Sequence, residues 1–476
     1  VSVSSHSDIY VGGIAGYSFG NGTIIGCTNS GSVAAYTDNT SIAADISTSA
    51  GGIAGYNDGG IITDCSNTGS VYSSHRAGGI VGYNTSNVDY PAGGAVTDCS
   101  NTGSVSSSYT AGGIVGNNDN GTINGCRNTG SISGSPDSRP TYAGGIAGSS
   151  NDNAMAGSVK DTIITGCYNG GEVSGAAYAG GIVGTNYSSL TLCVNTSEVS
   201  GSTMVGGIAG RNDNNCVISR CYNSGTVAQD GSNSSDSFAG GIAGNVYSGA
   251  AITNCYNIGA VTANSSHTYA GGIAGRIYNG AITNCYNTGT ITSILYACGI
   301  AGVAYDGVIT DCYYLNNISC GISSGPGATV SCTAEEMMKQ NTFEGFDFDT
   351  IWSMEGNADY LYPELLGVEM IFTKSLTEIK VTKQPDKLSY LEGAEFDPTG
   401  MEVTAYYNNG TSETVSEYEI NGYTSTPGTK TITVSFGGKS TTFQVTVTAK
   451  SLSGIQVMQL PEKLSYLEGK DTLDVT

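Results

Sequence analysis

Short apolar stretches recur ten times over the first two-thirds of the chain, at a fixed order within each repeat. Each repeat contains Gly-Ile-Ala/Val-Gly, then Ile-x-x-Cys, then Ser/Thr-Val/Ile-x-Ser, and residues 50–71 are the clearest copy. The copies begin 26 to 39 residues apart, a spacing typical of solenoid repeats. Because helical periodicity is absent, the pattern predicts short β-strands.

Turn-forming residues separate these stretches, as at Asn-Asp-Gly-Gly (57–60) and Asn-Thr-Gly (67–69). A single coil cannot bury its apolar residues, but stacked coils can, since each side chain lies over its copy in the next coil. We therefore predict that residues 1–332 form an all-β solenoid of about ten coils, roughly 50 Å long. The extra residues of the long repeats, 38–49 and 149–160, should be surface loops.

One isoleucine of each repeat stands at a fixed offset from the Gly-Gly pair and should form a single buried column. Close approach of the backbones would explain the glycines themselves. The predicted column consists of Ile14, Ile53, Ile80, Ile114, Ile146, Ile182, Ile208, Ile242, Ile273 and Ile300.

Ten of the 14 cysteines share one repeat position, where buried thiols would act as small hydrophobic side chains. They lack the CxxC or Cys/His spacing of a zinc site, although disulfides between neighbouring coils remain open. Cys216, Cys298, Cys320 and Cys332 fall outside this position. The repeat cysteines are Cys27, Cys65, Cys99, Cys126, Cys167, Cys193, Cys221, Cys255, Cys285 and Cys312.

An asparagine follows two residues after nearly every repeat cysteine. Stacked amides could hydrogen-bond to one another or to the backbone of the turn. The predicted column consists of Asn29, Asn67, Asn101, Asn128, Asn169, Asn195, Asn223, Asn257 and Asn287.

Residues 333–372 are expected to cap the last coil, because a solenoid must cover its open edge. Thr333 is suited to N-cap a short helix that runs to Gln340. Trp352 should be buried in this cap, among the aromatic residues Phe343, Phe346 and Phe348.

Longer alternating strands follow and predict an immunoglobulin-like β-sandwich over residues 373–450. One of its turns falls at 408–410 (Asn-Asn-Gly). The sequence Leu-Ser-Tyr-Leu-Glu-Gly at 388–393 returns at 464–469, so residues 451–476 are interpreted as the start of a second such domain. Both ends of the chain are expected to be cut within a repeated unit.

The repeat resembles the GLUG motif, a Gly-rich repeat of bacterial surface proteins that include some IgA-protease-type proteins. The distal module resembles the bacterial immunoglobulin-like domains, of the group 3 type, found in tandem on surface proteins. These resemblances imply an extracellular protein, at the bacterial cell surface or secreted, in which the immunoglobulin-like modules act as spacers.

The charge of the chain narrows the class of partner. Its net charge of −23 makes it a poor nucleic-acid binder, and it has no apolar run long enough for a membrane helix. The expected partners are host or cell-wall glycans or surface proteins. Lys and Glu become frequent only after Glu335, which supports a boundary near residue 333.

Residues for catalysis are scarce, and we expect no catalytic, cofactor-binding or metal-binding site. Gly-x-Ser-x-Gly at 16–20 places Ser18 in a glycine-rich turn without the helix of a nucleophile elbow. The chain has three histidines, His6, His75 and His267, and no HExxH motif. Aspartates in the first turn of some coils could bind calcium adventitiously, namely Asp58, Asp119, Asp213 and Asp306.

The basic residues of the solenoid occupy different repeat positions and predict no shared groove of the kind that a polysaccharide-cleaving solenoid needs. They are Arg76, Arg127, Arg139, Lys160, Arg211, Arg220 and Arg276.

A tyrosine directly follows the repeat cysteine in five coils. If the cysteine points inward, these tyrosines point outward and stack along one face. They would form either a sugar- or protein-binding strip or a stack that stabilises the sheet. The five are Tyr168, Tyr222, Tyr256, Tyr286 and Tyr313.

These features favour a non-catalytic structural and adhesive region, in which a rigid solenoid is displayed on immunoglobulin-like spacers. Two alternatives remain: an accessory region of a large secreted protease or glycosidase, and a carbohydrate-binding module.

Overall fold

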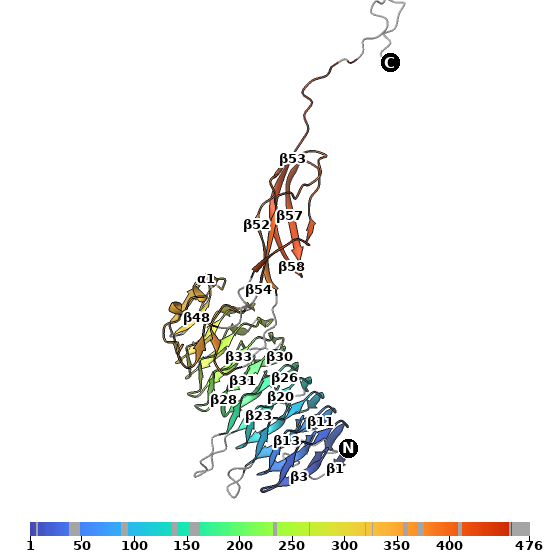
Figure 1. The fold of residues 1–476 in the computed structure, drawn as a ribbon, viewed down its shortest axis with the longest axis vertical. Helices are drawn as coiled ribbons and strands as arrows, with labels where there is room; N and C mark the ends of the chain where they lie inside the picture. The colour runs from blue at the N-terminus through green and yellow to red at the C-terminus, as the bar shows by residue number, and fades with distance from the viewer. Residues whose placement is uncertain are drawn as a thin grey trace, which may run out of the picture. The chain divides into compact units, whose positions relative to one another are not determined.

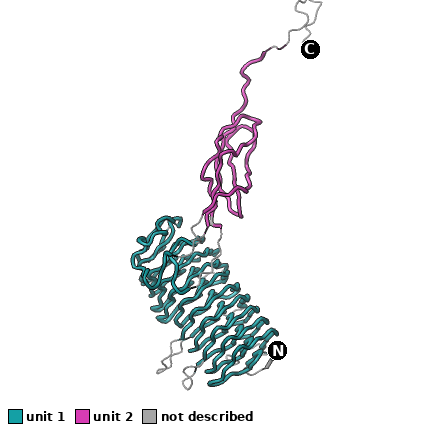
Figure 2. The backbone as a smooth tube through the Cα atoms, in the orientation of Figure 1, with its two compact units in different colours: residues 1–374, 408–410 teal, residues 375–407, 411–476 magenta. Residues whose placement is uncertain are grey.

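The computed structural model divides into two compact units, one of residues 1–374 with 408–410 and one of 375–407 with 411–476 (Figure 2). The residues that the structure describes are 1–5, 8–37, 48–86, 94–135, 141–151, 162–231, 236–265, 267–318, 320–325, 327–355, 360–368, 376–407, 412–456 and 458.

The first unit is a β-solenoid, as predicted, in which parallel strands of successive coils pair in register (Figure 1). A coil contains up to five short strands. In the second coil they are β7 (Thr48–Gly51), β8 (Ala54–Asp58), β9 (Ile61–Thr63), β10 (Ser66–Asn67) and β11 (Val71–Ser73). Stacking of equivalent strands produces five rows, which we number in this order.

Row 1 precedes Gly-Gly and row 2 follows it. Besides β7, row 1 contains β2 (Ile9–Gly12), β12 (Arg76–Gly78), β17 (Thr110–Gly112), β22 (Tyr142–Gly144), β26 (Val173–Gly180), β30 (Val199–Gly206), β35 (Ser237–Gly240), β40 (Thr268–Gly271) and β45 (Tyr296–Cys298). Besides β8, row 2 contains β3 (Ala15–Phe19), β13 (Val81–Thr85), β18 (Val115–Asp119), β23 (Ala147–Asn151), β27 (Val183–Tyr187), β31 (Ala209–Asn212), β36 (Ala243–Tyr247), β41 (Ala274–Tyr278) and β46 (Ala301–Tyr305).

Rows 3 and 4 flank the cysteine position. Besides β9, row 3 contains β4 (Thr23–Ile25), β14 (Ala95–Thr97), β19 (Thr122–Asn124), β24 (Ile163–Thr165), β28 (Ser189–Thr191), β32 (Val217–Ser219), β37 (Ala251–Thr253), β42 (Ala281–Thr283) and β47 (Val308–Thr310). Besides β10, row 4 contains β5 (Thr28–Asn29), β15 (Ser100–Asn101), β20 (Arg127–Asn128), β25 (Tyr168–Asn169), β29 (Val194–Asn195), β33 (Tyr222–Asn223), β38 (Tyr256–Asn257), β43 (Tyr286–Asn287), β48 (Cys312–Leu315) and β49 (Thr329–Cys332).

Row 5 completes the coil and joins row 1 in one sheet, because β26 and β30 are long enough to belong to both. Its other members are β1 (Ser2–Ser5), β6 (Val33–Thr37), β11, β16 (Val105–Ser107), β21 (Ile132–Gly134), β34 (Val227–Gln229), β39 (Val261–Ala263) and β44 (Ile291–Ser293).

The predicted isoleucine column is buried in nine of its ten coils, where each isoleucine is 0% exposed. Ile14 is the exception, with 50% of its surface exposed. The prediction is wrong there because Ile14 belongs to the first described coil and has Ile53 on one side only. The repeat cysteines line the same core, and none of the ten forms a disulfide.

The asparagine column forms the predicted hydrogen-bond ladder. The Nδ2 of each of the first eight asparagines donates to the Oδ1 of the next, at 2.7–2.8 Å, so the ladder joins all nine. The same nitrogen also donates to a backbone carbonyl two residues later, as from Asn169 to Gly171 at 2.8 Å. Each buried side-chain amide therefore forms hydrogen bonds both with the backbone of its own turn and with an asparagine of a neighbouring coil.

The second glycine of the Gly-Gly pair faces this ladder. A Cβ placed on Gly52 would overlap the side chain of Asn67 and the carbonyl oxygen of Gly79, and one on Gly51 would overlap the carbonyl of Ala54. The pair is therefore required because the backbones approach one another and the asparagines too closely for any other residue.

Residues 320–332 close the last coil. Gly299 and Ile300 donate backbone hydrogen bonds to Cys320 and Gly321, and β49 pairs with β48. A disulfide joins Cys298 to Cys320. The described part of 333–372, predicted to cap this coil, contacts it through Phe343 and Phe346, whose rings lie 5.0 and 5.6 Å from that of Tyr313 in β48; its role as a cap stays a prediction.

The described part of 333–372 covers the tyrosines of row 4 on the side of the solenoid. Tyr222, Tyr256, Tyr286 and Tyr313 are each no more than 3% exposed. They pack with Phe343, Trp352 and Tyr360 in one apolar cluster. The rings of Tyr222 and Tyr256 stack at 4.9 Å, and those of Tyr256 and Tyr286 at 5.0 Å. The predicted stacking is confirmed for Tyr222, Tyr256 and Tyr286, but the burial of these three and of Tyr313 rules out an exposed binding strip at their positions.

Short elements organise this covering segment. Thr333 caps α1 (Ala334–Met337), and the Glu336 carboxylate accepts a hydrogen bond from the Thr333 backbone amide. The helix is shorter than predicted, because a 3₁₀ turn, η1 (Gln340–Thr342), replaces its last residues. Trp352 is buried as predicted and lies in β50 (Trp352–Ser353), which pairs with β51 (Glu364–Leu365).

The second unit has the predicted immunoglobulin-like form of two sheets around an apolar core. One sheet contains β52 (Leu376–Lys383), β54 (Glu402–Tyr407) and β55 (Ser412–Val415), and the other contains β53 (Ser389–Leu391), β56 (Glu419–Asn421), β57 (Gly428–Phe436) and β58 (Lys439–Thr448).

Several sequence predictions lie outside the described residues. They concern His6, Arg139, Lys160, most of the two long loops, the turn at 408–410 and the second copy of the distal repeat at 464–469.

Candidate aromatic seam along the solenoid

Rows 1 and 2 bring three columns of side chains together along the solenoid. We call this strip the aromatic seam. Row 1 contributes Tyr10, Ser49, Arg76, Thr110, Tyr142, Tyr178, Met204, Phe238, Tyr269 and Tyr296. Row 2 contributes Tyr17, Tyr56, Tyr83, Asn117, Ser149, Thr185, Arg211, Asn245, Arg276 and Val303, and two residues later Phe19, Asp58, Thr85, Asp119, Asn151, Tyr187, Tyr247, Tyr278 and Tyr305.

The two rows meet directly near the N-terminal end of the seam. The ring of Tyr10, in row 1, lies 5.0 Å from that of Tyr56, in row 2. Tyr56 in turn stacks with Tyr17 at 4.9 Å and contacts Tyr83 at 4.8 Å, along the coil axis. The guanidinium of Arg76 lies 4.7 Å from the centre of the Tyr83 ring, a cation–π contact.

A cleft of about 360 Å³ opens in the middle of the seam. Its floor is polar. The Asp119 carboxylate accepts hydrogen bonds from Asn117 (3.0 Å), from Asn151 (2.7 Å) and from the hydroxyl of Tyr83. Ser149 donates to Asn151 at 3.2 Å. This network holds the side chains of three coils in fixed positions.

Aromatic rings border the cleft. Tyr142 contacts Tyr109 edge-on at 5.3 Å, and Tyr187, in row 2, also lines the cleft. Thr185 lines the cleft and is only 4% exposed, and its hydroxyl has no hydrogen-bond partner.

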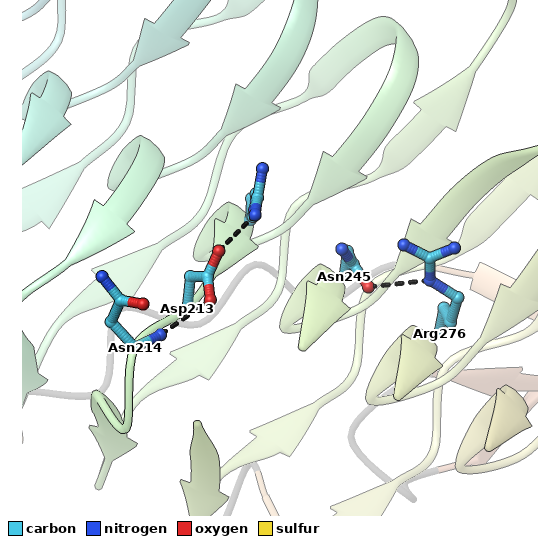
Figure 3. A network of polar contacts seen from close by, with 5 residues as sticks. Asp213, Asn214, Asn245 and Arg276 are labelled. Atoms are coloured by element: carbon cyan, nitrogen blue, oxygen red, sulfur yellow. Dashed lines mark hydrogen bonds and ion pairs between the residues drawn. The ribbon is translucent and has the colours of Figure 1, made fainter. Parts of the chain in front are cut away.

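Polar contacts hold the side chains in the C-terminal part of the seam, among them those of Asp213 with Asn214 and of Asn245 with Arg276 (Figure 3). Arg211 forms an ion pair with Asp213, whose carboxylate also accepts the Asn214 backbone amide at 2.8 Å. Arg276 donates to Asn245 at 3.0 Å and lies 4.2 Å from the ring of Phe238. These contacts with neighbouring residues of the seam hold both arginine side chains in place.

Burial perturbs the ionisable side chains of the seam. It raises the pKa of Tyr17 to about 12, with help from the hydrogen bond to Asp58, and it raises the pKa of Tyr83 further. Burial lowers the pKa of Arg276. The tyrosines are therefore uncharged hydrogen-bonding groups at neutral pH.

The candidate residues from the sequence are distributed as follows. Ser18 is 8% exposed and aligns with Asn57 in the interior column of row 2, so it is not presented as a nucleophile. Asp58 accepts the Tyr17 hydroxyl at 2.9 Å, and Asp306 is exposed. Within the described residues, no three His, Cys, Asp or Glu side chains are grouped as a metal site would require.

Of the basic residues predicted to share no groove, Arg76 is the one that lines the cleft of the seam among the described residues. Arg76, Arg211 and Arg276 all lie on the seam, because rows 1 and 2 converge in space although their residues hold different repeat positions. Arg127 instead lies 3.9 Å from the ring of Tyr168, and Arg220 donates to the backbone carbonyl of Leu366.

Sequence reasoning missed the seam itself. Its signal is an aromatic residue placed directly before Ala-Gly-Gly, as at Tyr142, or directly after Gly-Ile-Ala/Val-Gly, as at Tyr56. The two positions are separated in sequence by the Gly-Gly turn, so only the fold shows that they form one surface.

Comparison with known families confirms the two resemblances. The GLUG motif matches residues 7–34, 46–72, 73–106, 201–228 and 266–292, and the bacterial Ig-like domain (group 3) matches residues 383–447. The chain thus contains GLUG motifs within its β-solenoid and a bacterial immunoglobulin-like domain after it.

Similarity to individual proteins is more limited. The chain is 38% identical to pectate lyase L of Thermoclostridium stercorarium over 96 residues, which are 20% of this chain and 8% of that protein. It is 21% identical to a Bacteroides ovatus protein of known crystal structure that is provisionally assigned as an immunoglobulin A1 protease. That alignment covers 63% of this chain and 86% of the other, with a TM-score of 0.38.

Among the described residues, no helix has the length and apolar character needed to cross a membrane.

Proposed function

We propose that this chain is a non-catalytic adhesive region of a bacterial protein that is secreted or held at the cell surface, and that the aromatic seam binds an extended glycan. Residues 1–332 would be the binding solenoid, with 333–372 as its cover. Residues 373–450 and the domain that begins at 451 would be spacers.

The continuous seam is the observation that supports this proposal. Ring faces suit the C–H faces of sugars, and the amide, hydroxyl and carboxylate groups between them suit sugar hydroxyls. Neighbouring coils place equivalent rings about 5 Å apart, as at Tyr56 and Tyr83 (4.8 Å), so contacts repeat along one axis. Weak contacts multiplied in this way give avidity to a polymer.

The charge and the residue types argue against other ligands and against catalysis. A net charge of −23 disfavours nucleic acid. Hydrolysis of a glycan needs an acid and a base at the scissile bond, usually two carboxyl groups. In the cleft, the Asp119 carboxylate is instead engaged by three donors.

An extracellular location is supported by both matched families and by the Cys298–Cys320 disulfide, since disulfides persist in oxidising compartments.

The test of this proposal uses exposed seam tyrosines far from the cleft. Tyr17→Ala and Tyr278→Ala, at residues 48% and 42% exposed, are expected to weaken retention on a glycan array by about three- to tenfold each. Tyr36→Ala is the matched control, because Tyr36 is 42% exposed but lies in row 5. Equal effects of all three substitutions would contradict the proposal, and so would no effect of any of them.

A second candidate is an accessory glycan-binding region of a polysaccharide-degrading enzyme, favoured by the partial similarity to pectate lyase L. The complete gene distinguishes the two, because this candidate requires a catalytic domain outside the present sequence.

A further inference from the structure

We propose that the central cleft is the anchoring subsite of the seam, and that it binds one uncharged sugar unit in the interior of an extended glycan. This inference rests on the proposed function, because it specifies which part of the seam recognises the ligand and what chemistry the ligand has.

The unpaired hydroxyl of Thr185 is the first observation. Its Oγ1 is buried and lacks a hydrogen-bond partner, and Thr185, which lines the cleft, is only 4% exposed. An unsatisfied buried polar group costs stability, and native structures retain few of them. A ligand hydroxyl would supply the missing hydrogen-bond partner of Oγ1, since a hydroxyl both donates and accepts a hydrogen bond.

The fixed polar floor is the second observation. Asn117, Asp119 and Asn151 are already bonded to one another, so their remaining N–H groups and lone pairs point in set directions before a ligand arrives. The amides and the carboxylate offer both donors and acceptors, as the hydroxyl groups of a sugar ring require. Preorganisation of this kind reduces the entropic cost of binding.

The size and charge of the cleft define the unit that it takes. A volume of about 360 Å³ is near the lower end of ligand sites, which span about 300–1,000 Å³. One cation, Arg76, and one carboxylate, Asp119, line it. These two opposite charges offset each other, so the lining is neutral overall and an uncharged unit fits best.

The position of the cleft argues for an internal unit of a chain. Aromatic pairs continue the seam on both sides, with Tyr56 and Tyr83 before the cleft and Tyr247 and Tyr278 after it. A glycan anchored in the cleft can therefore extend in both directions over rings. Affinity should increase with the length of the oligosaccharide.

A peptide is the less suitable occupant. Along the seam the ladder N–H and C=O groups of rows 1 and 2 are engaged with neighbouring coils, so an added strand would find no open edge there.

The experiment compares Thr185→Val with Thr288→Val in the full chain. Thr288 is 9% exposed and its hydroxyl is also unpaired, but it lies in the turn after Asn287, away from the seam. Calorimetric titration would use cello-, manno- and xylo-oligosaccharides, with oligogalacturonate, heparin oligosaccharide and an unstructured peptide as the alternative ligands.

Binding of an uncharged oligosaccharide is expected, and Thr185→Val should weaken it about three- to tenfold while Thr288→Val leaves it unchanged. Both substitutions should keep or raise the melting temperature, because each removes an unpaired hydroxyl. If Thr185→Val binds more weakly but is no less stable, the threonine hydroxyl contacts the ligand and does not act only by stabilising the fold.

The other outcomes overturn the inference. If Thr185→Val binds as wild type while Tyr278→Ala binds weakly, the seam is a binding surface but the cleft is not its anchor. Binding of only the acidic glycans or the peptide contradicts the uncharged ligand. If none of these probes binds, both the inference and the glycan proposal are wrong.

Discussion

The indole nitrogen of Trp352 donates a hydrogen bond at 3.3 Å to the side chain of Asn254, a residue 98 positions earlier in the chain. Trp352 is completely buried and also contacts the rings of Tyr256 and Tyr286. This one side chain therefore joins the covering segment to a turn and to the tyrosine stack of row 4.

Replacement of Trp352 by alanine should destabilise the covering segment strongly. Loss of a fully buried tryptophan costs about 3–5 kcal/mol in typical cores. We expect a lower melting temperature and rapid proteolysis between residues 333 and 368, measured by limited digestion and mass spectrometry. Trp352→Phe is the control and should lose less stability, because phenylalanine keeps most of the ring contacts. A cleavage pattern identical to that of the wild type would disprove this role.

The asparagine ladder makes a second prediction. Asn169 donates to Asn195 and Gly171 and accepts from Asn128, so Asn169→Ala leaves several buried groups unpaired. We expect a loss of about 2–5 kcal/mol in the free energy of unfolding, measured by urea denaturation.

Asn29→Ala is the matched control for the ladder. Asn29 is only partly buried and stands at the start of the ladder, where it donates to Asn67 and Gly31. Its replacement should cost clearly less than that of Asn169. Equal losses would mean that the second hydrogen bond between coils, which Asn169 accepts from Asn128, and its deeper burial add nothing.

The repeating columns could be predicted from sequence because each coil reuses the same contact. Ile53, Asn67 and Cys65 have copies at the same offset in the next coil, so their neighbours are implied by the repeat. The end of the stack breaks this rule: Ile14 has the same motif but is half exposed.

The surfaces could not be predicted, because they depend on segments that are not repeated. Nothing in the sequence of Tyr256 indicates that residues 333–368 will cover it. Likewise, Tyr10 and Tyr56 meet only because row 1 of one coil lies against row 2 of the next. The Cys298–Cys320 pair was missed for the same reason, since Cys320 lies in the irregular closing segment.

That disulfide makes a third prediction. It closes a loop with a sequence separation of 22, which corresponds to a stabilisation of about 3 kcal/mol in the chain-entropy model. The double substitution Cys298→Ala/Cys320→Ala should lower the free energy of unfolding by this order. Wild-type protein in reductant should behave in the same way, whereas reductant should not affect the double variant. Insensitivity of the wild type to reductant would contradict the assignment.

The fully buried repeat thiols of Cys255 and Cys285 should resist alkylation in the folded protein. Burial raises the pKa values of Cys255 and Cys285 well above the ordinary thiol range, and both are 0% exposed. Only thiolates react, so iodoacetamide at neutral pH should label the partly exposed Cys27 and Cys216 first. Peptide mapping after denaturation should recover the buried cysteines unmodified. Early labelling of Cys255 would show that the coils open.

Alkaline pH should unfold the covered face of the solenoid. Burial raises the pKa values of Tyr256, Tyr286 and Tyr360 well above 10. In the unfolded chain these tyrosines ionise near pH 10. Above that pH the folded state binds more protons than the unfolded state, so the free energy of unfolding falls as pH rises; below it, their contribution is fully present.

The expected slope is about −1.4 kcal/mol per pH unit for each such tyrosine, once the unfolded side chains are ionised. Urea denaturation at a series of pH values from about 8 to 11 would measure it. Tyr256→Phe removes one titrating group and should make the slope shallower by about the contribution of one tyrosine. Tyr36→Phe, at an exposed position, should leave it unchanged. A slope that Tyr256→Phe does not alter would mean that Tyr256 ionises as readily in the folded protein as in the unfolded chain.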